Sequence, residues 1–320
     1  MKRLLVLLLC LSLAAVLASC RRGDAGPVSQ PTLTPTPRST SLPPVATPIP
    51  VGAEGNAVRM VFAVGAITST EEDEVQTAID GLQAALLEET SLIVEVTRAA
   101  TDAEAITALC DSVAGTVTVA WLNGVAYTAA AAQNCGTAAL QVAREGSTTE
   151  RALLVRNTRS GISSVSDMAD KNFCRVSASD FYTWLLPSIM LATSGFSTAS
   201  FASITDYDDV PELIAALEDG DCDAAGVSQS AYTTAGSRVD DLPGGMEIPI
   251  GVLTYPESFP LGQAQALTDA LIAIANGTRG TLLAPLLGQD ALVEVETDTL
   301  AAVRTAITRA GVDLSEMAGS

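Results

Sequence analysis

Residues 116–133 read T-V-T-V-A-W-L-N-G-V-A-Y-T-A-A-A-A-Q. The β-branched and apolar run at 116–122 predicts a buried strand, and residues 125–133 predict a helix directly after it. A strand that passes at once into a helix is the repeating unit of an α/β sheet. This stretch therefore predicts a chain in which strands and helices alternate.

The same alternation continues on both sides of this stretch. It predicts two α/β units with mostly parallel sheets, and a C-terminal part that could rejoin the first unit. The predicted strands are 59–65, 92–97, 116–122, 138–143, 152–156, 172–177, 201–204, 224–227 and 248–253. The predicted helices are 75–86, 101–110, 125–133, 181–194, 210–218, 261–277 and 299–310.

The composition excludes several classes of function. The chain has 320 residues, with 17 Lys and Arg against 37 Asp and Glu, and a formal net charge of −20. Because contacts to phosphates need Lys and Arg, we do not expect so acidic a chain to bind nucleic acid. The chain has no histidine, which excludes His-based acid–base catalysis and His-ligated zinc.

The N-terminus is typical of a bacterial lipoprotein. Lys2 and Arg3 precede an apolar run at 4–16 that is too short to span a bilayer, and residues 17–20, L-A-S-C, resemble a lipobox. We expect the signal peptide 1–19 to be removed and Cys20 to carry lipid, so that the protein is extracytoplasmic and anchored to the cell membrane. The alternative is an ordinary signal peptide in which Cys20 is incidental.

Residues 20–56 predict a tether between this anchor and a folded part that starts at about 57. Eight prolines occur between positions 27 and 50. Proline has no N–H and a fixed φ, so this stretch is not expected to pack as helix or sheet.

Four cysteines remain outside the signal and the lipidation position, and they predict disulfides. Outside the cytoplasm an even number of cysteines favours disulfides, here with three possible connectivities. Pairing within each α/β unit gives Cys110–Cys135 and Cys174–Cys222. A metal site is the rival interpretation, but no pair has the C-x-x-C spacing, and we expect no metal.

Ligands of open α/β sheets bind at the carboxyl ends of the strands. Aromatic and hydroxyl side chains gather at these ends, as in a pocket for a small molecule, although each aromatic ring could instead pack beneath a loop. The candidate ligand-binding residues are Thr68, Ser69, Trp121, Asn123, Tyr127, Ser179, Asp180, Phe181, Tyr182, Thr183, Asp206 and Tyr207.

Three motifs resemble one known family. Residues 118–130, T-V-A-W-L-N-G-V-A-Y-T-A-A, residues 159–171, R-S-G-I-S-S-V-S-D-M-A-D-K, and residues 217–225, L-E-D-G-D-C-D-A-A, follow in the order seen in phosphonate-type substrate-binding proteins of ABC importers. The resemblance implies a type 2 periplasmic-binding-protein fold with two hinged lobes. It further implies that the protein binds a small solute and works with permease and ATPase subunits. We expect a monomer that uses no cofactor. The expected lobes are 57–150 plus 248–320, and 151–247.

The sequence departs from this family where the family binds its anion. The family's S-T-S-G motif is replaced by residues 180–183, D-F-Y-T, and its downstream histidine is absent near Asp206. A carboxylate at a helix N-cap takes backbone N–H groups for itself and repels anions. We therefore expect a neutral or cationic solute, unless Asp180 is only a structural cap and the solute binds elsewhere.

The leading functional hypothesis is thus a solute-binding lipoprotein of an ABC importer. The alternative is a lipoprotein that senses its ligand and signals to a membrane partner without transport. An enzyme is disfavoured, because the chain lacks histidine, a metal-ligand spacing and a G-x-S-x-G motif.

Overall fold

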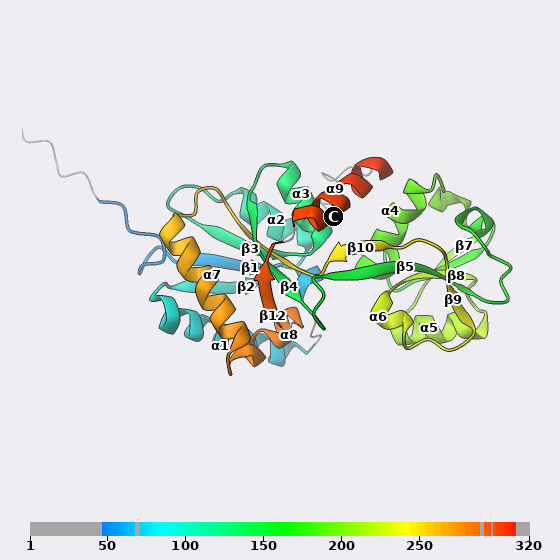
Figure 1. The fold of residues 1–320 in the computed structure, drawn as a ribbon, viewed down its shortest axis with the longest axis horizontal. Coiled ribbons are helices and arrows are strands. Elements are labelled where there is room, and N and C mark those ends of the chain that lie inside the picture. Colours follow the sequence, from blue (N-terminus) through cyan, green and yellow to red (C-terminus); the bar gives the residue numbers. More distant parts are fainter. Residues whose placement is uncertain (1–46, 68–70, 179, 289–290, 296, 312–320) are drawn as a thin grey trace, which may run out of the picture. The chain divides into compact units, whose positions relative to one another are not determined.

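The computed structural model describes residues 47–311, except 68–70, 179, 289–290 and 296. Within them the chain forms two β-sheets, each flanked by helices (Figure 1). This is the α/β fold that the sequence predicts.

The first sheet has the strand order β12-β4-β11-β3-β1-β2. Strand β1 pairs in parallel with β2 and β3, whereas β11 lies antiparallel between β3 and β4. The last two strands of the chain therefore complete a sheet that its first half begins. The strands are β1 (Val58–Phe62), β2 (Val94–Arg98), β3 (Thr118–Leu122), β4 (Thr137–Ala143), β11 (Val252–Tyr255) and β12 (Ala291–Glu294).

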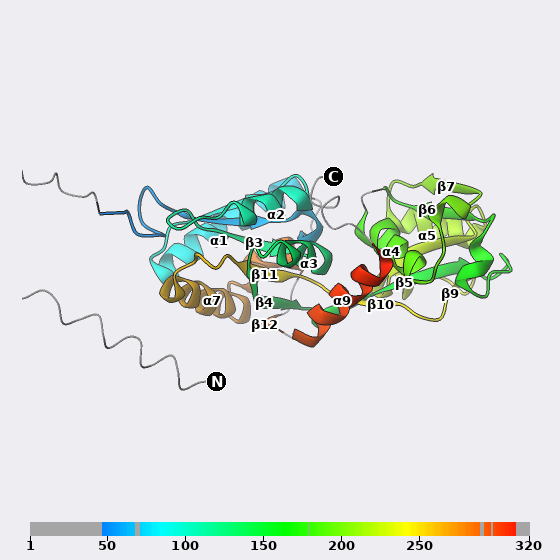
Figure 2. The ribbon, with the colours of Figure 1, turned by 90° about the horizontal axis from the view of Figure 1, so that it is seen from above.

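Helices cover the first sheet with apolar faces. In α1, the residues Val75, Ile79, Leu82 and Leu86 are all buried, which is the helical spacing seen in the sequence. Helix α1 lies beside α7 in both views (Figures 1 and 2). The helices are α1 (Glu72–Thr90), α2 (Asp102–Cys110), α3 (Gly124–Ala132), α7 (Leu261–Asn276), α8 (Ala284–Leu287) and the 3₁₀ turns η1 (Val64–Ala66) and η5 (Gly280–Leu282).

The second sheet has the order β10-β5-β8-β6-β7, and β9 also pairs with β5. Strand β5 is antiparallel to β8, β9 and β10, while β6 is parallel to β7 and β8. All the other strands of this sheet therefore run opposite to β5. The strands are β5 (Thr149–Asn157), β6 (Asn172–Arg175), β7 (Ser203–Asp206), β8 (Ala224–Ser228), β9 (Val239–Asp241) and β10 (Met246–Pro249).

The helices of the second sheet are short apart from α5. The helix predicted at 181–194 begins with a π-helical turn, η3, and continues as α4. The elements are η2 (Val165–Met168), η3 (Phe181–Leu185), α4 (Leu186–Thr193), η4 (Thr198–Ser200), α5 (Val210–Asp219) and α6 (Gln229–Tyr232).

The predicted returning strand at 248–253 is wrong in one respect. It is two strands in different sheets, β10 paired with β5 and β11 paired with β3 and β4. Pro249 ends β10, because proline has no N–H to continue a ladder. Gly251 begins the second part, where a Cβ atom would lie 3.0 Å from a methyl group of Val142.

The chain also joins the first core earlier than expected, since Val51 is buried there.

The C-terminal helix α9 (Thr297–Ala310) contacts elements beside both sheets. It packs on α3, α4 and β10 (Figure 2). Val303 and Ile307 are buried in a cluster that includes Leu186 of α4 and Ile248 of β10. The predicted helix is therefore present, but its packing is not confined to the first sheet.

Both predicted disulfides are present. Cys110 at the end of α2 bonds to Cys135 before β4, with Cα atoms 4.6 Å apart. Cys174 in β6 bonds to Cys222 before β8, with Cα atoms 6.0 Å apart. Each disulfide links segments of one sheet and its helices, as pairing within each unit requires.

Candidate functional site

The carboxyl end of β3 opens directly into the N-terminus of α3. Asn123 is the N-cap of α3, and its Oδ1 accepts hydrogen bonds from the N–H groups of Val125 and Ala126 at 3.1 and 2.9 Å. Its Nδ2 donates to a carboxylate oxygen of Asp102 at 2.5 Å. Asn123 is therefore buried, and its Oδ1 leaves those two N–H groups unavailable to a bound anion.

Trp121 does not occupy the position expected from the sequence. Its side chain is completely buried, and its ring stacks on Phe62 of β1 with centroids 6.1 Å apart. Strand β3 lies between β1 and β11 and is buried on both faces, so the indole packs in the core. Tyr127 belongs to the same buried cluster. The expectation that these rings stack on a solute is wrong for the arrangement in this structure.

An exposed apolar side chain lies at the neighbouring strand end. Val64 in η1, just after β1, is 47% exposed. The same turn leads towards Thr68 and Ser69, which lie outside the described residues, as do Ser179 and Cys20. Sequence reasoning missed Val64 because a single valine after a strand carries no signal of exposure.

The corresponding end of β6 opens into η3, with Asp180 as its N-cap. The carboxylate Oδ1 of Asp180 accepts from the N–H of Thr183 at 2.7 Å and from its hydroxyl at 2.6 Å. The Thr183 hydroxyl in turn accepts from the N–H of Val176 at 3.0 Å, and the side chain is fully buried. Asp180 thus caps the helix as predicted, but Thr183 is an internal link and not a solute-facing group.

Close packing fixes this helix start against β8. A Cβ atom at Gly226 would lie 2.0 Å from Cγ of Pro187 and 2.9 Å from the carbonyl oxygen of Tyr182. Only glycine lets the backbones approach so closely. The π-helical turn is closed by hydrogen bonds such as that from the Leu185 N–H to the Asp180 carbonyl at 3.0 Å, and such turns are frequent at functional sites.

Phe181 and Tyr182 form an aromatic pair at this helix start. Their rings meet edge to face with centroids 5.1 Å apart, and both side chains are half-buried. Burial raises the pKa of the Tyr182 hydroxyl, and the nearby Glu150 raises it further. The phenol therefore stays protonated at neutral pH and can act as a hydrogen-bond donor.

Asp206 and Tyr207, at the end of β7, are directed towards other partners. Asp206 forms a 2.7 Å ion pair with Nε of Arg175, whose guanidinium lies 4.5 Å over the ring of Trp184. The Tyr207 hydroxyl lies 3.7 Å from the sulfur of Cys222. Its pKa is raised, first by burial and then by Asp221 and Glu212. The contact of Tyr207 with a solute therefore stays a prediction, and the charge of Asp206 is already paired.

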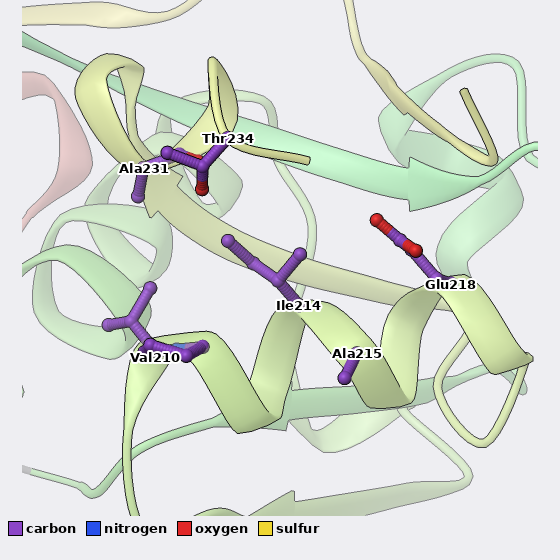
Figure 3. A pocket seen from close by; sticks show the side chains of 7 residues that line it. Val210, Ile214, Ala215, Glu218, Ala231 and Thr234 are labelled. Atoms are coloured by element: carbon purple, nitrogen blue, oxygen red, sulfur yellow. The ribbon is translucent and has the colours of Figure 1, made fainter. Parts of the chain in front are cut away.

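A cavity of about 420 Å³ lies elsewhere, between α5 and the segment of α6 (Figure 3). Ile214 points from α5 towards Thr234 across it. Its polar groups are engaged within the protein, since Thr234 donates to the carbonyl of Ala231 and Glu218 accepts from the N–H of Gly236. We do not regard it as the candidate site, because it contains none of the residues at the strand ends. Its lining is Val210, Pro211, Ile214, Ala215, Glu218, Ala231 and Thr234.

Two further searches restrict the chemistry of the described part of the chain. Residues 47–311, with the gaps given above, contain no group of three or more Cys, Asp or Glu side chains placed to hold a metal ion. Within the same residues, no helix has the length and apolar character needed to cross a membrane.

Comparison with protein families gives a match over most of the chain. The model of a family described as "ABC transporter, phosphonate, periplasmic substrate-binding protein" matches residues 64–300. No sequence among curated proteins matches.

Solved structures share the fold at low sequence identity. A Xanthomonas citri protein bound to ATP aligns with a TM-score of 0.62 and 12% identity, over 80% of this chain and 98% of that one. PhnD1 from Prochlorococcus marinus, in complex with methylphosphonate, gives 0.56 and 13%, over 79% and 98%. A binding protein of an ABC phosphonate transporter from Pseudomonas aeruginosa gives 0.57 and 16%, over 80% and 87%. These similarities establish the two-lobed fold alone.

Proposed function

Because the chain belongs to the family of periplasmic substrate-binding proteins of phosphonate ABC transporters, we propose that it captures one small solute and presents it to a membrane permease. Members of this family bind a small molecule, act with permease and ATPase subunits, and are not enzymes. The proposed site is formed by the carboxyl ends of the strands in the two sheets, where open α/β sheets bind ligands.

The proposed solute is neutral or cationic. The observation that carries this proposal is the carboxylate of Asp180, which already accepts the N–H and the hydroxyl of Thr183. A phosphoryl group would need these donors and would meet a negative charge in their place. Asn123 closes the N-terminus of α3 in the same way. Asp180 and Asn123 therefore occupy the N–H groups of Thr183, Val125 and Ala126, which an anion at either helix start would otherwise use.

The proposed contacts on the second sheet are the half-buried rings of Phe181 and Tyr182 together with Asp180. An aromatic face and a carboxylate side by side favour a cation, which gains from both. Thr68, Ser69 and Ser179 remain proposed contacts on sequence grounds. Asp206 also remains a proposed contact, although its carboxylate already forms an ion pair with Arg175.

Titration calorimetry with four probes tests the charge of the solute. The probes are inorganic phosphate and methylphosphonate as anions, and choline and 1-methylpyridinium as cations. We expect neither anion to bind and at least one cation, favoured by the aromatic pair, to give measurable heat. Micromolar binding of methylphosphonate, with no heat from the cations, would contradict the proposal, because helix N–H groups would then outweigh the carboxylate.

We also propose that Cys20 carries lipid and that residues 20–56 tether the binding domain to the membrane. Replacing Cys20 by Ser should abolish incorporation of radiolabelled palmitate in bacterial cells and release the protein from the membrane fraction. Cys10→Ser, within the predicted signal peptide, is the matched control and should leave labelling unchanged. Equal labelling of both variants would show that Cys20 is incidental.

A further inference from the structure

We propose that Asp102 is a positioning residue of the solute site, which holds the amide of Asn123 and the turn at Gly65 in one fixed arrangement. The inference rests on the proposed function, because it concerns the first-sheet half of the same site. Asp102 itself need not touch the solute. It belongs to the N-terminus of α2, and its partners come from the segments that follow β1 and β3.

The contacts of Asp102 join three separate segments. Its Oδ1 accepts the backbone N–H of Gly65 at 2.9 Å, and its Oδ2 accepts Nδ2 of Asn123 at 2.5 Å. Hydrogen bonds to an ionised carboxylate are among the stronger ones in proteins. One side chain therefore sets the distance between the turn after β1 and the start of α3.

The approach at Gly65 is too close for any side chain. A Cβ atom there would lie 2.6 Å from Nδ2 of Asn123 and 2.9 Å from Oδ2 of Asp102. A larger residue here would have to displace the Asn123 amide or the Asp102 carboxylate, so glycine lets the turn close on the pair. The same turn exposes Val64.

The carboxylate also determines which way the Asn123 amide points. The amide has an accepting oxygen and a donating nitrogen. Its oxygen must face the N–H groups of Val125 and Ala126 to cap α3, so its nitrogen must face an acceptor. Asp102 offers acceptors only, and this fixes the orientation of the amide.

The start of α3, which Asp102 helps to position, packs against the segment that connects the two sheets. A Cβ atom at Gly124 would lie 2.6 Å from Cδ of Pro249, the last residue of β10. The segment that Asp102 positions is thus in direct contact with the chain that runs from β10 to β11. Disturbing Asp102 should alter the site's first half without opening the hydrophobic core, in which Asp102 has no part.

The test is a side-chain exchange between the two partners. In Asp102→Asn alone, the new amide has one oxygen and one NH₂ group in place of two accepting oxygens. Its NH₂ group must therefore face either the NH₂ group of Asn123 or the N–H of Gly65, and both are donors. Asn123→Asp alone places two carboxylates in contact. The double variant Asp102→Asn/Asn123→Asp restores every hydrogen bond, because the amide at position 102 accepts from Gly65 and donates to the new N-cap carboxylate. Asp111→Asn, at the exposed other end of α2, is the control.

Amide hydrogen exchange of Gly65, Val125 and Ala126 in the full chain gives the first readout. We expect roughly tenfold or greater loss of protection in each single variant, recovery in the double variant, and no change in Asp111→Asn. Unchanged protection in the single variants, or failure of the double variant to recover, would overturn the proposal.

Calorimetry with choline and 1-methylpyridinium gives the second readout. Whichever cation binds the unmodified protein should bind roughly tenfold more weakly to Asp102→Asn and regain its affinity in the double variant. Recovery of exchange protection without recovery of affinity would show a purely structural role. If neither cation binds the unmodified protein, the proposed solute class fails, while hydrogen exchange still decides whether Asp102 holds the turn at Gly65 and the start of α3 in place.

Discussion

Replacing Cys174 and Cys222 together by alanine is expected to lower the free energy of unfolding by about 4 kcal/mol. The disulfide links residues separated by 48 positions, and in the chain-entropy model the stabilisation grows with the length of the closed loop. Both sulfur-bearing side chains are completely buried, so alanine would add a small packing loss to the entropic loss. Urea unfolding followed by circular dichroism measures the change.

A matched pair of variants separates these contributions. Cys110→Ala/Cys135→Ala opens a shorter loop, of 25 positions, and should lower stability by about half a kcal/mol less. Reduction of the unmodified protein by dithiothreitol keeps the side-chain volume and isolates the effect of the cross-link. An unfolding midpoint that does not move on full reduction would contradict the disulfide's role as a stabilising constraint.

The elements that local sequence patterns determine were predictable. Residues 116–133 form β3 and α3, because β-branched alternation and helical spacing act within one element. The cap of α2 by Thr101 follows from the same local chemistry. Residues 248–253 show the limit of such patterns. Whether a strand joins the first or the second sheet depends on partners far away in the sequence. Here a single apolar run contributes β10 to the second sheet and β11 to the first.

The candidate site shows the same division. Asp180 could be predicted as an N-cap, because its partner Thr183 is three residues away. The burial of Trp121 follows from the buried strand predicted at 116–122, but its ring partner Phe62 comes from another strand and could not be identified. Asp102 was missed because its partners Gly65 and Asn123 are 37 and 21 positions away. Acidic residues in a first helical turn are ordinary and carry no signal of such a role.

The substitution Asp180→Ser should reverse the charge preference of the solute site. Serine is a good N-cap, so the helix start at η3 should persist. The variant removes a negative charge and returns a hydroxyl to the position where the family places one. We expect methylphosphonate binding to strengthen by roughly a hundredfold, from undetectable to millimolar, because like charges at contact cost several kcal/mol. Affinity for 1-methylpyridinium should weaken by roughly tenfold.

The control must separate charge at the site from charge on the protein as a whole, which is strongly acidic. Asp209 serves this purpose, because it caps α5 in the same way, accepting the N–H of Glu212 at 2.8 Å. Asp209→Ser should therefore change the net charge by the same amount and replace the same kind of cap, yet leave both probes unaffected. Titration calorimetry of the two variants at matched ionic strength gives the comparison. An equal gain of anion binding in Asp209→Ser would mean that net charge alone governs selection, and an Asp180→Ser variant that still rejects methylphosphonate would place the solute away from the start of η3.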